Sequence, residues 1–455
     1  MGRMKPLRRW PAGAQSRRGL LSILYLQLSI VLLAACAAPS PAPAAVATAA
    51  PSATPARPTA TARPATPTPA PPTATPAPEP LTVWVAEEEP AFVAAREALE
   101  GAAAAIGVPL EVLARPPDGV RLSLATAELV GDPAPDLIWA DQEALVGLLT
   151  DGRLQPLDEL PGGTPLPALM TAAKADGELW GAPLAARGAL LLLYNRAIVA
   201  APPATSDELI VSARAAVTPE IAGLVMAWDE ARWLLPWLYG FGGAPVSADG
   251  QTITLDAPAT ADALNLLREL QIAGEDETHN FGAAQRLFAR GYAAMAIDGD
   301  WALEHYQAVS DTLELGIAPL PSVPATGRPA IAPLGGTYLM LHRDLEGERL
   351  EQAHRLIEAL TVPKAQVALA LALGRLPALS DALEAPALLA DPALAAAAAG
   401  AAVAPGLPPT VAARCALFGI DVWLPAALAG TRTPAETATR MQREAEACLE
   451  RAAQG

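Results

Sequence analysis

Residues 228–233 read Trp-Asp-Glu-Ala-Arg-Trp, which places two large rings among three charged side chains. Unpaired charges resist burial, so this mixture is unusual for the interior of a domain. Carboxylate and guanidinium groups form paired hydrogen bonds, and a flat ring offers an apolar platform beside them. Glu230, Arg232 and Trp233 are therefore candidate ligand-binding residues. The alternative is that the segment is the solvated start of a helix.

Further candidates follow two predicted strands. Trp139 and Asp141 lie at the carboxyl end of a strand predicted over residues 136–140, the edge at which open α/β sheets bind ligands. Asp141 is equally suited to cap the next helix. Residues 87–89, three glutamates, follow the first predicted strand in the same way. Either one of them reaches a ligand or all three are solvated.

The charge of the chain argues against a nucleic-acid partner. The formal net charge is −17, and the first 35 residues hold six Lys/Arg and no acid, so the chain without them carries −23. Contacts to phosphates need clustered Lys and Arg. A length of 455 residues with 52% hydrophobic residues suits two compact units with a sizeable core.

Strands alternate with helices along the folded part of the chain. Helices are predicted over residues 91–105 and in most of the chain after residue 347. Strands are predicted at residues 81–85, 110–113, 136–140, 190–194, 292–297, 316–318 and 338–341. This alternation predicts an α/β fold with a mainly parallel sheet.

Several segments resemble the family 1 extracellular solute-binding proteins, the maltose-binding-like group. Residues 152–157, Gly-Arg-Leu-Gln-Pro-Leu, are similar to a family stretch that ends G-x-L-x-P-L. Residues 177–183 with 193–196 resemble the family's G-x-x-Y-G-x-P … Y-Y-N-x signature, and residues 288–301 resemble F-x-x-G-x-x-A-M … G-x-W. Residues 316–321, 374–378 and 423–436 also fit in family order.

The resemblance covers roughly residues 81 to 445 and implies a periplasmic-binding-protein fold. Its two α/β lobes are joined by crossing strands and hold the ligand in the cleft between them. We assign residues 81–188 plus 300–343 to the N-terminal lobe and residues 189–299 plus 344–455 to the C-terminal lobe. The resemblance implies a monomer that captures a small molecule, above all a carbohydrate, and delivers it to the permease of an ABC importer.

The resemblance adds three aromatic candidates. Trp301 follows the family's G-x step where the chain crosses between lobes, so its ring faces the cleft or packs at the hinge. Phe418 and Trp423 lie where the family often supplies an aromatic, with core packing as the alternative. Sugars present apolar faces and hydroxyl rims, so we expect Trp301 to stack on a neutral sugar and Glu230 to accept its hydroxyls. A cationic solute such as a polyamine is the alternative ligand.

An exported glycan-acting enzyme is the main alternative function. Asp298 and Asp300 flank a glycine and would suit a carboxylate pair, but the resemblance explains this step as a lobe crossing. The sequence contains no H-E-x-x-H, no G-x-S-x-G and no Cys/His cluster with metal spacing. Its histidines are scattered, at His279, His305, His342 and His354. We therefore expect no catalysis, no cofactor and no metal.

Residues 1–35 have the layout of a secretory signal, in which a basic stretch precedes a short apolar run. The run ends Leu33-Ala34-Ala35-Cys36, which resembles the bacterial lipobox. This predicts that Cys36 is acylated and holds the protein at the outer face of the cytoplasmic membrane. An uncleaved membrane anchor is the alternative. Arg17-Arg18 also resembles a twin-arginine motif, so the export route stays open.

Residues 37–80 are almost entirely Pro, Ala, Thr and Ser, which predicts an extended, semi-rigid tether after Cys36. The remaining cysteines are Cys415 and Cys448. In an exported domain we expect them to form a disulfide, and two buried thiols are the alternative.

Overall fold

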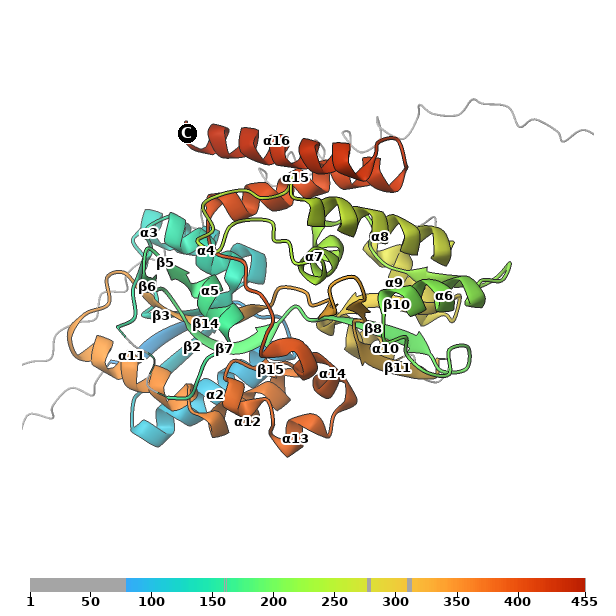
Figure 1. Ribbon diagram of the computed structural model, residues 1–455. Helices are drawn as coiled ribbons and strands as arrows, with labels where there is room; N and C mark the ends of the chain where they lie inside the picture. The colour runs from blue at the N-terminus through green and yellow to red at the C-terminus, as the bar shows by residue number, and fades with distance from the viewer. Residues whose placement is uncertain (1–78, 159, 161, 276–279, 309–312, 455) are drawn as a thin grey trace, which may run out of the picture. The chain divides into compact units, whose positions relative to one another are not determined.

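The computed structural model describes residues 79–158, 160, 162–275, 280–308 and 313–454. The predicted signal, Cys36 and nearly all of the predicted tether lie outside these residues, as does His279. Two sheets organise the described chain (Figure 1). We call the seven-stranded sheet with its helices the first lobe and the four-stranded sheet with its helices the second lobe.

The sheet of the first lobe has the order β15-β7-β14-β3-β1-β2, and β4 pairs with β14. Its strands are β1 (Leu81–Val85), β2 (Leu110–Ala114), β3 (Leu137–Asp141), β4 (Leu154–Gln155), β7 (Ala182–Arg187), β14 (Gly335–His342) and β15 (Leu376–Pro377). β1 is parallel to β2 and β3, whereas β14 runs antiparallel to β3, β4 and β7. The sheet is thus mixed rather than mainly parallel, because β14 enters it from the second lobe.

Helices cover this sheet, and α2 packs against both α11 and α12. The consecutive residues Val83, Trp84 and Val85 of β1 are all buried, as expected for a strand covered on both faces. The helices are α2 (Ala91–Ile106), α3 (Val120–Val130), α4 (Gln142–Thr150), α5 (Pro167–Ala173), α11 (Gly347–Leu360), α12 (Pro363–Leu373) and α13 (Pro386–Leu389). The next helix, α14 (Pro392–Ala401), packs on β11 and β8 of the second-lobe sheet as well as on β15.

The sheet of the second lobe has the order β11-β8-β10-β9. Its strands are β8 (Leu190–Asn195), β9 (Ala222–Val225), β10 (Ala293–Gly299) and β11 (Leu315–Pro319). Its helices are α6 (Ser206–Ala216), α7 (Ala231–Gly240), α8 (Pro258–Gly274), α9 (Phe281–Ala289), α10 (Leu303–Ala308), α15 (Val411–Leu428) and α16 (Pro434–Ala452). The smaller elements are β5 (Lys174–Ala175), β6 (Glu178–Leu179), β12 (Ser322–Val323), β13 (Arg328–Pro329) and the 3-10 turns η1 (Pro117–Gly119), η2 (Asp300–Ala302) and η3 (Ser380–Ala382).

Two segments lie elsewhere than the sequence-based division placed them. β11 pairs with β8 in the second lobe, although its residues were assigned to the N-terminal lobe. α11 and α12 pack on α2 in the first lobe, although their residues were assigned to the C-terminal lobe. The reason is the path of the chain, which stays in the second lobe through β11 and re-enters the first lobe at β14. The C-terminal hairpin of α15 and α16 packs on α8 of the second lobe.

The link from β7 to β8 is only Gly188 and Ala189, so the two sheets meet directly at this point. Gly188 has φ +96, a conformation that favours glycine. The carboxylate of Asp300, just beyond β10, accepts the backbone N–H groups of both link residues at 2.9 and 3.1 Å. In return, the Asp300 N–H donates to the Ala189 carbonyl at 2.9 Å. Asp300 therefore ties the two-residue link to the end of β10 in the second lobe.

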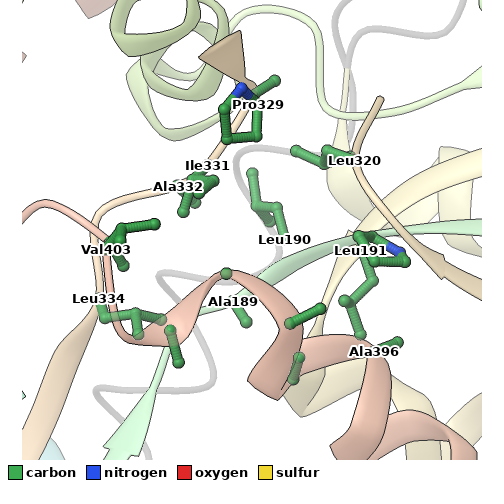
Figure 2. A pocket seen from close by; sticks show the side chains of 17 residues that line it. Ala189, Leu190, Leu191, Leu320, Pro329, Ile331, Ala332, Leu334, Ala396 and Val403 are labelled. Atoms are coloured by element: carbon green, nitrogen blue, oxygen red, sulfur yellow. The ribbon is translucent and has the colours of Figure 1, made fainter. Parts of the chain in front are cut away.

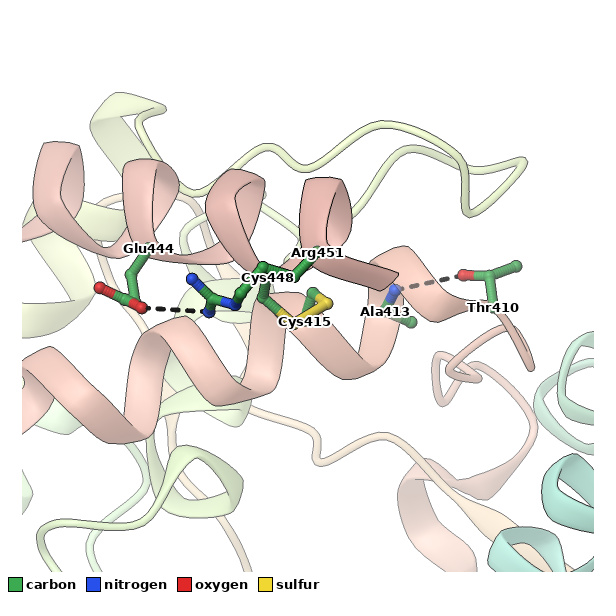
Figure 3. The surroundings of a disulfide bond; sticks show 6 residues. All are labelled: Thr410, Ala413, Cys415, Glu444, Cys448 and Arg451. Carbon is green, nitrogen blue, oxygen red and sulfur yellow. Dashed lines mark hydrogen bonds and ion pairs between the residues drawn. A yellow bond between two sulfur atoms is a disulfide. The ribbon is translucent and has the colours of Figure 1, made fainter. Parts of the chain in front are cut away.

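A disulfide between Cys415 and Cys448, the predicted pair, ties α15 to α16 (Figure 3). Thr410 caps α15 through the N–H of Ala413, and Thr433 with Glu436 forms a capping box at the start of α16. By length and composition α15 could cross a membrane, and half of it is buried in this structure. Its disulfide and its packing on α16 identify it as a core helix of the second lobe.

Candidate functional site

A cavity of about 980 Å³ is lined by elements of both lobes. This volume is within the range of small-molecule sites. The first lobe contributes the start of α4 and the facing ends of β7 and β14, and the second lobe contributes the start of α7, Trp301 and one face of α15. The predicted residues that line it are Asp141, Glu230, Arg232 and Trp301.

Trp301 presents its ring to this cavity from η2, directly after β10. The ring lies on the backbone of Gly299, where an added Cβ would meet three ring atoms at 2.2–2.3 Å. The edge of Trp233 supports it, with centroids 6.4 Å apart and planes at 88°. Because 39% of Trp301 remains exposed, the ring is both fixed and available for stacking.

Glu230 and Arg232 stand on either side of Ala231 at the start of α7. Burial and the neighbouring Asp229 carboxylate raise the pKa of Glu230, while Arg232 opposes this shift. The Arg232 guanidinium lies 5.1 Å from the centre of the Trp301 ring. Burial lowers the pKa of Arg232, and the Asp300 carboxylate opposes that shift. The start of α7 thus offers a hydrogen-bond acceptor and a cationic donor next to an aromatic face.

Asp141 is both a helix cap and part of the lining of the cavity. It is the N-cap of α4, where Oδ1 accepts the N–H of Ala144 at 3.0 Å, and it also lines the cavity. The adjacent Gln142 and Glu143 line the cavity too. The start of α4 therefore faces the start of α7 across the site.

Trp139 and Trp233 do not line the cavity, because both side chains are buried. Trp139 lies on the central strand β3 and is 0% exposed, because its ring packs in the hydrophobic core of the first lobe. The Trp233 Nε1–H donates to the Ile297 carbonyl at 3.0 Å, which holds its ring behind Trp301. The structure gives both rings supporting positions rather than the predicted direct contact.

Phe418 and Trp423 also lie outside the lining of the cavity. Phe418 is exposed, and Trp423 lies between the guanidinium groups of Arg432 and Arg440, at 5.6 and 5.4 Å from its ring. α15 instead lines the cavity with side chains that the sequence analysis missed, namely Ala413, Arg414, Leu417 and Asp421. Their spacing along one face of a helix was the available signal, but the same spacing is typical of ordinary packing.

A buried ion pair lies at the carboxyl ends of the first-lobe strands. Arg375 donates to both carboxylate oxygens of Glu87, at 2.6 and 2.8 Å, and to the Thr337 hydroxyl at 3.1 Å. The Trp139 Nε1–H donates to the same carboxylate at 3.3 Å. Burial acts to raise the pKa of Glu87, but Arg375 outweighs it and holds that pKa below its usual value. Glu87 is thus held by the protein, while Glu88 and Glu89 are exposed.

Asp298 and Asp300 are both engaged by the protein. Asp298 is buried and accepts the Tyr306 hydroxyl at 2.6 Å, and Asp300 holds the link between the lobes. Burial raises the pKa of Asp300, while the link N–H groups and Arg187 oppose this shift. Within the described residues, no group of three or more His, Cys, Asp or Glu side chains is placed to hold a metal ion.

A second hollow of about 120 Å³ lies beside the link and is lined only by apolar residues and glycine (Figure 2). Leu190, Ile331 and Val403 are among the side chains around it. Such a lining provides no side-chain hydrogen bonds for a polar solute, so the large cavity is the candidate site.

A family model described as bacterial extracellular solute-binding protein matches residues 100–396. The maltotriose-binding protein of Pyrococcus abyssi is 28% identical over 268 residues, which cover 57% of this chain and 58% of that protein. The match therefore spans less than two thirds of this relative.

Solved structures of sugar-binding proteins share the fold. A cyclo/maltodextrin-binding protein complexed with maltotetraose has a TM-score of 0.73 at 21% identity, over 82% of this chain and 98% of its own. The maltose/maltodextrin-binding domain from Bdellovibrio bacteriovorus, bound to maltotriose, has a TM-score of 0.63 at 25% identity, over 82% of this chain and 100% of its own. These likenesses show the predicted fold of two α/β lobes.

Proposed function

Because the chain belongs to the bacterial extracellular solute-binding proteins, we propose that it captures a carbohydrate in the large cavity. It then delivers this ligand to the permease of an ABC importer and catalyses no reaction. The observation that carries the proposal is the exposed Trp301 ring next to Glu230 and Arg232 in a cavity lined by both lobes.

The chemistry of the cavity suits a neutral sugar. A pyranose has an apolar face that stacks on a ring, and hydroxyls that bind carboxylates and guanidinium groups. The similar proteins support this ligand class, because one is a maltotriose-binding protein and the two solved structures hold maltotetraose and maltotriose. We therefore propose a maltodextrin-like oligosaccharide as the first ligand to test.

A cationic solute is the second candidate, because Asp229, Glu230 and Asp421 line the same cavity as Trp301. Acids beside an aromatic face suit an ammonium group. However, the Arg232 guanidinium already lies 5.1 Å from the centre of the Trp301 ring. This neighbouring positive charge disfavours a second cation at the ring and favours the sugar.

Calorimetry with the purified domain tests the proposal. The titrants are maltose, maltotriose and maltotetraose, with spermidine and choline as the cationic set. We expect stoichiometric binding of at least one oligosaccharide, and chromatography of the sugar afterwards should show no product. Binding of spermidine or choline without any sugar would contradict the carbohydrate proposal, and turnover would point to the exported enzyme.

We further propose that the protein works outside the cytoplasm as a lipid-anchored monomer. The lipobox-like end of the predicted signal supports acylation of Cys36, and the family is extracellular. Cys36→Ser should release the protein from membranes into the soluble fraction, whereas Ser40→Ala, a control four residues away, should not. A Cys36→Ser variant that stays as firmly membrane-bound as the parent would contradict the anchor.

A further inference from the structure

α15 has two opposite faces with different partners. Ala413, Leu417 and Asp421 recur every fourth residue and line the cavity. Behind them, Cys415 is bonded to Cys448 of α16 (Figure 3). An added Cβ at Gly419 would come within 2.5 Å of the Met441 carbonyl of α16, so the two helices approach closely there. α15 is therefore held from behind by α16 while it presents a carboxylate to the cavity.

The start of α7 has no side-chain cap of its own. Glu230 occupies the N-cap position, yet its side chain makes no capping hydrogen bond. The first N–H groups of a helix have no partner within the helix and need one elsewhere. The N–H of Ala231 finds this partner in Asp421 Oδ1, 2.6 Å away and 190 residues further along the chain.

We propose that Asp421 is a positioning residue for the ligand site. Its carboxylate holds the first turn of α7 and thereby fixes how Glu230 and Arg232, on either side of Ala231, face the cavity. An anionic acceptor at a helix N-terminus is also favoured by the helix dipole. This proposal rests on the proposed function, because it takes the large cavity as the place where the ligand binds.

Two variants distinguish the hydrogen bond from Ala231 to Asp421 from the negative charge of Asp421. Burial and the Asp229 carboxylate raise the pKa of Asp421, and the Ala231 N–H opposes this shift. Asp421 in turn helps to raise the pKa of Glu230. Asp421→Asn removes the charge but keeps an oxygen that can accept the Ala231 N–H, whereas Asp421→Ala removes both. The carboxylate of Asp421 is partly enclosed, but the residue as a whole is exposed, so truncation leaves no buried cavity.

The matched control is Asp391→Ala. Asp391 caps α14 by accepting the N–H of Ala393 at 2.7 Å, and it does not line the cavity. Each variant is compared with the parent by calorimetry with maltotriose, by amide hydrogen exchange of a peptide that contains Ala231, and by thermal unfolding. The exchange measurement needs no ligand.

We expect Asp421→Ala to weaken maltotriose binding about tenfold, the effect of losing one hydrogen bond to a charged group, and to speed exchange at Ala231. Asp421→Asn should stay within about threefold of the parent, and Asp391→Ala should change neither affinity nor exchange at Ala231. Parent-like exchange at Ala231 in Asp421→Ala would overturn the proposal, as would an Asn variant that behaves like the Ala variant. If the parent fails to bind maltotriose, the ligand proposal fails, and the exchange data still decide whether Asp421 holds α7.

Discussion

Among single residues, Trp301 combines exposure with a fixed orientation, because its ring rests on Gly299 and against the edge of Trp233. We predict that Trp301→Ala weakens binding of an oligosaccharide by about 1–3 kcal/mol, the order expected for a stacked aromatic ring. Calorimetry measures this change. Phe418→Ala, an exposed ring outside the cavity, serves as the control and should leave the affinity unchanged. Equal losses in both variants, or none in Trp301→Ala, would contradict the assignment.

A second single residue, Asp298, makes the stability of the folded protein depend on pH. Burial raises its pKa to about 6 from an ordinary 3.8, although the Tyr306 hydroxyl opposes this shift. The folded state therefore binds more protons than the unfolded state between these values, and the contribution of Asp298 to stability falls as the pH rises through that window.

We predict that Asp298→Asn gains stability relative to the parent as the pH rises from 4 to 7, by up to about 3 kcal/mol. The asparagine carries no charge, so this position no longer titrates. Urea unfolding of both proteins across that pH range measures the difference. Asp262→Asn, at an exposed position on α8, is the control and should show a nearly constant difference. A constant difference for Asp298→Asn as well would contradict the prediction.

At the scale of elements, the hairpin of α15 and α16 forms part of the second-lobe core and one wall of the cavity. The disulfide closes a loop with a sequence separation of 33 residues. On the chain-entropy account, its loss lowers the free energy of unfolding by about 3–4 kcal/mol. We predict this loss for the Cys415→Ala/Cys448→Ala double variant, measured by chemical denaturation. In the parent, titration under denaturing, non-reducing conditions should find no free thiol from this pair, and two reactive thiols would contradict the bond.

The sequence predicted where helices and strands lie along the chain better than it predicted which of them pack together. Apolar runs located β1, β3, β8, β10 and β14. The mixture of charges and rings at residues 228–233 pointed to Glu230 and Arg232, and the family resemblance pointed to Trp301. The burial of Trp139 depends on the elements that pack over it in the core of the first lobe, which no local pattern reveals. The sequence also did not reveal the role of Asp421, because its hydrogen-bond partner Ala231 is 190 residues away along the chain. Contacts between segments that are distant in the chain could therefore not be predicted from the sequence.

For the whole molecule, the two-residue link and the cavity lined by both lobes predict closure around a ligand. Small-angle scattering with and without a saturating oligosaccharide should show a smaller radius of gyration in its presence. A sugar that calorimetry shows not to bind is the control. The forward scattering also gives the mass, which we expect to be that of a monomer. An unchanged radius at saturation would contradict closure.

The interleaved path of the chain has a consequence for biogenesis. The core of the second lobe combines residues from β8 with residues of α15 and α16, such as Ala416 and Met441. A polypeptide that emerges amino end first, from a ribosome or a translocation channel, cannot complete this lobe until α16 has followed. Because α15 also supplies Arg414 and Asp421 to the cavity, the site does not exist on a partly emerged chain. The complete lining of the cavity therefore forms only after α15 and α16 have emerged.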